Sequence, residues 1–186
     1  MSEAGHIDPS NKKIALLIAV LALVLAFSET LGKGAQTAAL SYNIEASNLW
    51  AFFQAKTIRM TQVRTAAEAA DLERPLASGE ARAAYEKQIE SWKKTAARYD
   101  SEPETQEGRK ELSARAKAAE EKRDRSLAAY HNYEVASAAV QIAIVLASAS
   151  IITNFVVLAW IAGGLGLVGV AFCLIGFFAP TAVHLF

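Results

Sequence analysis

The stretch Val135–Phe186, VASAAVQIAIVLASASIITNFVVLAWIAGGLGLVGVAFCLIGFFAPTAVHLF, decides the fold of this chain. Its only ionisable side chains are Cys173 and His184. A helix needs about 20 mostly apolar residues to cross the hydrocarbon core of a bilayer, so this stretch is long enough to cross twice. Cys173 is the single cysteine of the chain and therefore cannot form an intrachain disulfide.

Two adjacent glycines divide this apolar stretch. Gly163 and Gly164 lie in the segment WIAGGLG, and glycine permits the backbone conformations that a tight turn between helices requires. We predict transmembrane helices over residues 135–161 and 165–183, joined as a hairpin.

A further apolar segment lies near the N-terminus. No charged or strongly polar residue occurs from Ile14 to Phe27, and Lys12 and Lys13 precede this run. We predict a polar tail over residues 1–10 and a first transmembrane helix over residues 11–31. A cleaved signal peptide is the alternative, and the two C-terminal helices would then still anchor the chain.

The middle of the chain, residues 32–134, carries nearly all of its charge. The 186 residues contain 19 Lys and Arg and 19 Asp and Glu, and all of these except four near the N-terminus lie between Ser28 and Glu134. The bases are matched by acids, which disfavours nucleic acid as a partner. The middle is rich in Ala, Glu, Lys, Arg and Gln, all strong helix formers, and we predict an extramembrane helical stalk.

Turn signals divide the predicted stalk. One lies at Pro75 and Gly79, and another at Pro103. Ser101 and Glu104 have the spacing of a capping box that would begin a helix. We predict one helix that runs from the first span to about residue 72, one from about 75 to 99, and one from about 104 into the second span.

Apolar and small residues at coiled-coil spacing predict how the stalk helices pack. Two seams alternate steps of four and three residues: Tyr85, Ile89, Trp92, Ala96 and Tyr99, then Leu112, Ala116, Ala119, Arg123 and Ser126. They fit a hairpin within one chain or a bundle shared between chains, and we favour the bundle because alanine seams bury little area.

A straight first helix would overshoot its partners. From Ser28 to Leu72 it would rise roughly 68 Å, whereas the helix that returns to the membrane from Glu104 to Glu134 spans only about 46 Å. We expect a bend or break in the first helix, at Gly32–Gly34 or at Ser47–Asn48.

The segment Ser47–Arg59, SNLWAFFQAKTIR, is apolar on every side of a helix. On a helical wheel that starts at Ile44, its apolar side chains fall at about 140°, 240°, 80°, 180° and 320°. These candidate contact residues are Leu49, Trp50, Phe52, Phe53 and Ile58. We predict that they contact another subunit; anchoring at the lipid headgroups is the alternative. Lys56 and Arg59 would mark the edge of the covered stretch.

Three segments carry a resemblance to a known family. They are KKIALLIAVLALVLAFSETLGKGAQTAAL, IEASNLWAFFQAKTIR and VQIAIVLASASIITN. They are similar to landmark segments of bacterial membrane proteins catalogued as domain of unknown function 4337. The resemblance implies a multi-pass protein of the bacterial inner membrane, and it implies no activity, substrate or catalytic residue.

No catalytic, nucleotide-binding or zinc motif occurs in the sequence. His131 and Glu134 lie one helical turn apart, but a metal site needs three or four ligands. We therefore predict a protein that is not an enzyme and has no cofactor and no metal.

Polar residues near the predicted membrane boundary form the main candidate polar site. Three spans would bring the end of the first to the level of the start of the second, which groups Glu29, Lys33, His131, Glu134 and Gln141. A carboxylate such as Glu29 in an apolar helix tends to find a partner or to be protonated. The alternative is a boundary residue that reaches water.

Small residues predict where the membrane helices touch. Ala139, Ala143 and Ala147 recur every fourth residue, as do Ala162 and Gly166. Polar residues also lie in the second span: Gln141, Ser148, Ser150, Thr153 and Asn154. They would bond between helices or line a narrow aqueous path.

Two functions fit this sequence. We favour a membrane-anchored homo-oligomer that forms a scaffold or binds another membrane protein; the alternative is a small channel or an accessory subunit of a transport complex. Lys12 and Lys13 favour a cytoplasmic N-terminus and a periplasmic stalk, whereas Lys122, Arg123 and Arg125 favour the opposite.

Overall fold

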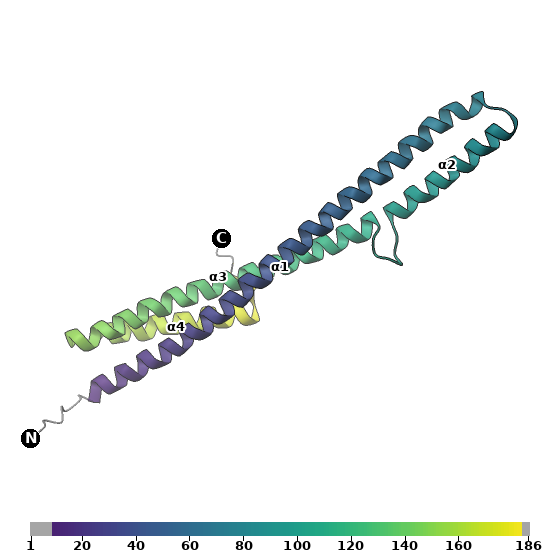
Figure 1. The fold of residues 1–186 in the computed structure, drawn as a ribbon. Helices are drawn as coiled ribbons and strands as arrows, with labels where there is room; N and C mark the ends of the chain where they lie inside the picture. Colours follow the sequence, from purple (N-terminus) through teal and green to yellow (C-terminus); the bar gives the residue numbers. More distant parts are fainter. Residues whose placement is uncertain (1–8, 184–186) are drawn as a thin grey trace, which may run out of the picture. The chain divides into compact units, whose positions relative to one another are not determined.

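The computed structural model describes residues 9–183, which are helical throughout apart from short connections and contain no strand. Four α-helices follow one another (Figure 1): α1 Pro9–Glu73, α2 Gly79–Asp100, α3 Arg109–Thr153 and α4 Val157–Phe178. Two 3-10 turns, η1 Arg74–Leu76 and η2 Pro180–Ala182, follow α1 and α4. The all-helical prediction is confirmed. Residues 1–8 of the predicted polar tail lie outside the described residues.

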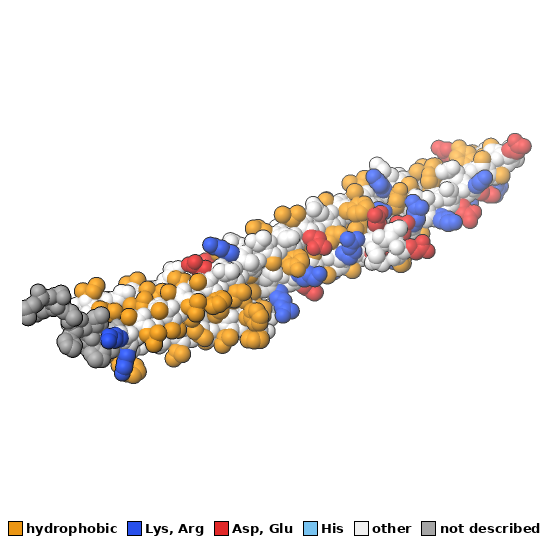
Figure 2. All heavy atoms as spheres, turned by 60° about the horizontal axis from the view of Figure 1, so that its bottom comes forward, with side chains coloured by type: hydrophobic (Ala, Val, Ile, Leu, Met, Phe, Trp, Pro, Cys, Tyr) orange, Lys and Arg blue, Asp and Glu red, His pale blue; other side chains and the backbone are white. Residues whose placement is uncertain are grey.

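The chain divides into two compact units, to which α1 and α3 both contribute. Unit 1 comprises residues 9–40 and 123–183 of the described chain, and unit 2 comprises residues 41–122. Apolar side chains predominate on the face of unit 1 that Figure 2 shows, whereas acidic and basic side chains are interspersed over unit 2. Unit 2 is shorter at both ends than the predicted stalk, residues 32–134.

Small residues bring the three helices of unit 1 together. Leu21 of α1 packs in one buried cluster with Val140, Ala143 and Ala147 of α3 and Ala162 of α4. A Cβ atom added at Gly166 would lie 2.5 Å from Leu21 Cδ2, and one added at Gly169 would lie 2.4 Å from Val140 Cγ2. The Cβ atom added at Gly169 would also lie 3.1 Å from the Ala136 carbonyl oxygen, so this position requires glycine for the close approach of α4, whereas at Gly166 the end of the Leu21 side chain can move aside.

Helices α1, α3 and α4 are each long and apolar enough to cross a membrane. The predicted turn at Gly163 and Gly164 is wrong, because both glycines lie inside α4. The chain turns instead at Asn154, whose φ of 53° is left-handed. Asparagine tolerates this conformation better than most residues, and the glycines are left free to serve helix packing.

In unit 2, α2 and the first part of α3 lie one after the other against α1. Ala67 and Ala70 of α1 pack against Ile89 of α2, and Ala46 and Leu49 pack against the start of α3. Figure 1 shows α2 beside the C-terminal part of α1. Both predicted seams therefore pack on α1 of the same chain.

The predicted break in α1 is wrong. The helix continues through Gly32–Gly34 and through Ser47–Asn48. It needs no break because two shorter helices in series match its length. Gly32 is buried, and a Cβ atom there would lie 3.4 Å from Tyr133 Cβ, so this glycine allows α1 to approach α3.

The predicted start of the third stalk helix is also wrong. Residues 101–108 form a turn, Ser101 caps the end of α2, and α3 begins at Arg109. Ser101 Oγ donates to Glu111 Oε1 at 2.6 Å, so Glu111 rather than Glu104 is its carboxylate partner. A Cβ atom at Gly108 would lie 2.4 Å from the Glu102 nitrogen, so the tight turn needs glycine there. The turn signals at Pro75 and Gly79 are confirmed.

Candidate functional site

The aromatic segment of α1 packs partly within its own chain. Leu49 is buried against α3, and the rings of Trp50 and Phe53 lie against the same cluster. Trp50 Nε1 donates to Glu120 Oε1 of α3 at 2.9 Å, and the two rings meet edge to face at 5.4 Å. Trp50 and Phe53 therefore pack in part against α3 of the same chain. Their contact with another subunit stays a prediction.

Lys56 lies where the neighbour of α1 changes from α2 to α3. It is only 6 % exposed, and its Nζ lies 3.7 Å from Glu102 Oε2 and 3.6 Å from Glu107 Oε2. The same ammonium lies 5.3 Å from the ring centre of Phe52 and 5.5 Å from that of Tyr99. Lys56 was expected at the edge of the covered stretch, but it holds the turn between α2 and α3 against α1.

Arg109, the first residue of α3, ties the same junction together. Its Nε donates to Thr57 Oγ1 at 2.9 Å, and its guanidinium lies 5.0 Å from the ring centre of Phe53. Its Nη1 also lies 3.2 Å from Asp100 Oδ1, and Lys110 Nζ lies 3.0 Å from Asp100 Oδ2. The hydrogen bond from Lys110, with the nearby positive charges, holds the pKa of Asp100 below its ordinary value.

Glu111 closes the turn that precedes α3. Its carboxylate accepts hydrogen bonds from Ser101 Oγ and from the backbone N–H of Glu102. The bond from Ser101 is the main cause of a lowered pKa of Glu111. The segment Ser47–Arg59 of α1 thus meets charged residues of the turn between α2 and α3 and of the start of α3. We call this charged and aromatic contact the α2–α3 junction.

In unit 2, the face of α1 that points away from α2 and α3 is exposed and carries no charged side chain. Of the five candidate contact residues, Phe52 and Ile58 stay exposed, at 36 % and 59 %, and Ile58 lies on this face. Ile58 belongs to a row that alternates steps of four and three residues. We call this row the outer seam: Ile44, Asn48, Ala51, Ala55, Ile58, Gln62, Thr65, Ala69 and Leu72. All nine residues are exposed.

The outer seam lies opposite the face that packs against α2 and α3. On the wheel from Ile44 it occupies an arc from about 280° to 40°, whereas the buried residues Leu49, Met60 and Ala67 fall near 150°. No charged side chain of α1 between Ile44 and Leu72 falls in this arc. Four heptads of uncharged residues are the pattern by which two helices pair.

Sequence reasoning missed the outer seam because its apolar residues are interrupted by Asn48, Gln62 and Thr65. The signal that could have found it is the absence of charge at every position of the four-and-three repeat. In a helix as charged as this one, that absence is informative.

The predicted boundary cluster is brought together in part. Glu29, Lys33 and Glu134 line one cavity of about 310 Å³, which Tyr130 and Tyr133 also line. Gln141 Nε2 donates to Glu29 Oε1 at 3.4 Å.

His131 contacts this cluster through Glu134, which lies on the same helix, α3. Its Nδ1 lies 3.6 Å from Glu134 Oε2, one turn along α3. No ion pair joins Glu29 to Lys33 or to His131 among the described residues.

Of the five predicted packing residues of unit 1, four are buried and one is half-buried. Ala143, Ala147, Ala162 and Gly166 are buried, whereas Ala139 is half-buried. The sequence missed Asn132, which is fully buried and donates from Nδ2 to Ala128 O at 2.8 Å and to Pro180 O at 3.0 Å.

Most polar residues of the second span bond to nearby backbone. Ser148 donates to Ile144 O and Thr153 donates to Ala149 O, each four residues back, and Ser150 donates to Phe155 O across the turn. Asn154 lies in the turn rather than in a helix. Gln141 is the polar residue of this set that bonds to another helix, through Glu29.

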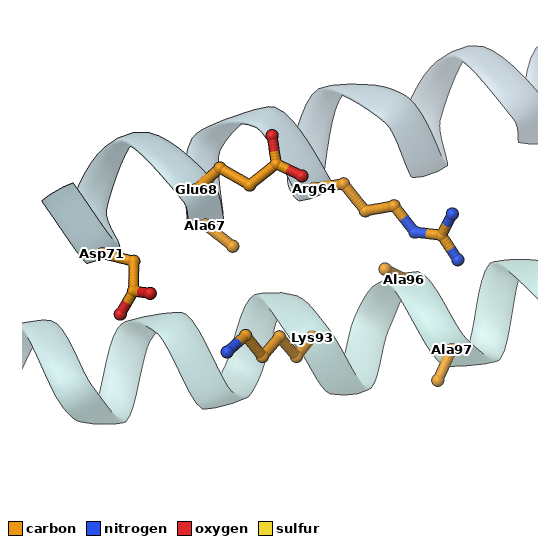
Figure 3. Close-up of a pocket in the computed structure, with 7 residues that line it drawn as sticks. All are labelled: Arg64, Ala67, Glu68, Asp71, Lys93, Ala96 and Ala97. Carbon is orange, nitrogen blue, oxygen red and sulfur yellow. The ribbon is translucent and has the colours of Figure 1, made fainter.

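A cavity of about 450 Å³ lies between α1 and α2 in unit 2 (Figure 3). Ala67 of α1 and Ala96 of α2 lie at different levels on the inner sides of the two helices, and their small side chains fill little of the space between them. Its charged lining residues are two bases and two acids: Arg64, Lys93, Glu68 and Asp71. These charges balance, so the cavity has no preference for an ion of either sign.

The described residues contain no group of three or more His, Cys, Asp or Glu side chains that could hold a metal ion.

Comparison with known proteins gives a family. The profile of a domain of unknown function, DUF4337, matches residues 10–179. Searches of curated proteins and of solved structures return no match. The match spans all four helices, and the chain belongs to the DUF4337 family.

Proposed function

We propose that this protein is a multi-pass membrane protein that self-associates through the outer seam of α1 and so forms a scaffold, to which another membrane protein can bind. The observation that supports it is the seam itself: nine exposed, uncharged residues at heptad spacing, on the face of α1 turned away from α2 and α3. An exposed row of this kind in water is stabilised by pairing with a similar row.

A second copy of this chain is the occupant that the seam fits. Copies in one membrane share one orientation, so their α1 helices are parallel and the same heptad positions meet. Asn48 would then face Asn48 of the other copy, and a polar residue at one core position fixes the register of a parallel coiled coil. Ile44, Ile58 and Leu72 would supply most of the buried apolar area.

For the membrane part, we propose that the apolar portions of α1, α3 and α4 cross the inner membrane of a bacterium. Their length and composition support this, and so does the surface of unit 1. The lysines at positions 12 and 13 support a cytoplasmic N-terminus and a periplasmic unit 2. A cysteine at Ser78 in a Cys173→Ala background tests the side: an impermeant thiol reagent should label it on intact spheroplasts.

We prefer the scaffold to a channel because the polar side chains of the second span bond mainly to backbone. Ser148 and Thr153 each donate to a carbonyl of their own helix, which leaves few polar groups to line a path.

The mass of the detergent-solubilised protein tests the proposal. We expect wild type to be a dimer or larger oligomer, and Ile44→Glu with Ile58→Glu to shift it to the monomer, since like charges would meet at two core positions. The matched control is Ala114→Glu with Ala118→Glu on an exposed face of α3, which should leave the mass unchanged. A monomeric wild type, or equal masses for both double variants and wild type, contradicts the proposal.

Cross-linking adds the register. In a Cys173→Ala background, Ala51→Cys should form a disulfide-linked dimer under mild oxidation, whereas Ala84→Cys on the exposed face of α2 should not. Equal cross-linking of the two would show that the contact does not use the seam.

A further inference from the structure

Unit 1 contains an apolar groove between α1 and α4. It has a volume of about 260 Å³ and is lined by seven side chains, six of them hydrocarbon and the seventh the thiol of Cys173. Phe27 and Leu31 of α1 face Cys173, Leu174 and Phe177 of α4 across it. A groove of this kind in a helix pair that crosses a membrane is filled by hydrocarbon, since water would find no hydrogen-bonding partner there.

A second cavity continues the groove toward the end of α4. It has a volume of about 440 Å³, and Leu31 and Phe177 line both cavities. Small residues of α1 keep it open: a Cβ atom added at Gly34 meets nothing within 4 Å. The two cavities therefore form one site that changes from apolar to polar along its length.

Arg125 supplies the only charge on the lining of this second cavity. Among the described residues Arg125 has no hydrogen-bond or ion-pair partner. The carboxylates of Glu29 and Glu134 line a different cavity, the one near Lys33. Thr30, Ser126 and Tyr133 add hydroxyl groups to the lining. The site thus has a net positive charge and no carboxylate, which favours an anion.

The site lies at headgroup level. Asn132 bonds to Pro180 just after α4 ends, and Arg125 lies two turns of α3 before Asn132, about 10 Å along the helix axis. The polar layer of a bilayer begins where the apolar helices end and is about 5–8 Å thick on each side. A guanidinium that reaches back from Arg125 can meet a phosphate there, and it matches phosphate oxygens in pairs.

We propose that this site binds one anionic glycerophospholipid, with an acyl chain in the groove between α1 and α4 and the phosphate at Arg125. Basic pockets between membrane helices are a known mode of anionic lipid binding. The inference rests on the membrane insertion proposed above and does not depend on self-association.

Cys173 gives a direct readout because it lines the groove and is the only cysteine. Delipidated protein in dodecylmaltoside is titrated with dioleoyl phosphatidylglycerol or dioleoyl phosphatidylcholine, and the rate of Cys173 alkylation by N-ethylmaleimide is measured. We expect phosphatidylglycerol to protect the thiol at about tenfold lower concentration than phosphatidylcholine. Both carry a phosphate, but the choline cation of phosphatidylcholine offsets its charge and is repelled by Arg125, a difference worth about one charge-assisted contact. Equal protection by the two lipids overturns the selection of an anionic lipid by Arg125.

Two matched pairs of variants locate the lipid. Arg125→Gln should remove the preference for phosphatidylglycerol, and Arg125→Lys should retain part of it. Gly34→Leu should fill the cavity and prevent protection, whereas Gly34→Ala should preserve it, and both substitutions favour the helix. Native mass spectrometry should show one retained phosphatidylglycerol in wild type and none in Gly34→Leu.

The failure of this inference can be told apart from failure of membrane insertion. A preference for phosphatidylglycerol that persists in Arg125→Gln, or protection that persists in Gly34→Leu, overturns the site in a protein that still fractionates with membranes. Recovery of the wild-type chain in the soluble fraction without detergent would overturn the insertion itself.

Discussion

Both units of this chain use alanine at their helix contacts, but they differ in the other residues that they place there. In unit 1, glycines that have no side chain stand at the contact: Gly166 and Gly169 of α4 leave room for Leu21 and Val140. In unit 2, large side chains are added between α1 and α3, with Trp50 bonded to Glu120. Lipid gives apolar helices no hydrophobic reason to associate, so close contact must stabilise them, whereas water favours burial of large rings. The difference in packing is the one expected if unit 1 lies in lipid and unit 2 in water.

Trp50→Ala should have the largest effect, because it removes the main ring that unit 2 buries between α1 and α3. We expect a loss of about 3 kcal/mol in the free energy of unfolding, the low end for a buried aromatic residue, since Trp50 is half-buried. Thermal unfolding followed by circular dichroism measures it. Trp50→Phe is the control: it keeps a ring, loses the bond to Glu120, and should cost about 1 kcal/mol.

This variant also decides between two interpretations of the aromatic segment. The sequence favoured a subunit contact, which would lower the oligomer mass and spare the stability of the single chain. A Trp50→Ala protein with wild-type thermal stability and reduced mass would support the subunit contact instead.

Gly169→Leu tests packing in unit 1. A Cβ atom at Gly169 would lie 2.4 Å from Val140 Cγ2 and 3.1 Å from the Ala136 carbonyl oxygen, so α4 would be pushed from α3. We expect a loss of about 2 kcal/mol, typical of an overpacked contact. Gly164→Leu on the same helix meets nothing within 4 Å and should be tolerated, as measured by thermal unfolding in detergent. Equal stability of both variants would mean that α4 does not depend on this contact.

The sequence predicted the helices better than their contacts. Long uncharged runs and strong helix formers were enough to place four helices, because these signals are local. The turn at Asn154 was missed because Gly163 and Gly164 are the stronger local turn signal, yet Gly166 and Gly169, a few residues on, show that this part of α4 uses small residues for packing.

The sequence also provided little indication of the polar contacts, because their partners are distant along the chain. Lys56 looked like the edge of an apolar stretch, and only the fold brings Glu102 and Glu107 beside it. Asn132 gave no signal at all, because its partner Pro180 lies 48 residues away and pairs with it only after α4 has returned.

Acid should weaken unit 2 at its junction. The folded-state pKa values of Asp100 and Glu111 lie below their ordinary values, so these carboxylates contribute stability that is present above the unfolded pKa, near 4, and is lost as the pH falls through the folded pKa. Urea midpoints between pH 7 and pH 3 should therefore fall toward low pH. Asp100→Asn with Glu111→Gln should be less stable at pH 7 and show a shallower fall; an unchanged slope would show that other carboxylates cause it.

Glu29→Leu should have the smallest effect and tests whether the boundary cluster of unit 1 stabilises the fold. Glu29 is exposed, its bond from Gln141 is long at 3.4 Å, and no ion pair ties it to Lys33 among the described residues. A surface substitution with such partners changes stability by about 0.5 kcal/mol or less, and a leucine on an apolar helix in lipid is favourable. We therefore expect thermal stability in detergent equal to or slightly above wild type, with Glu29→Gln as the control that keeps a polar side chain. A loss of more than about 1 kcal/mol in Glu29→Leu, spared in Glu29→Gln, would show that Gln141 and the cavity near Lys33 need a polar partner from α1.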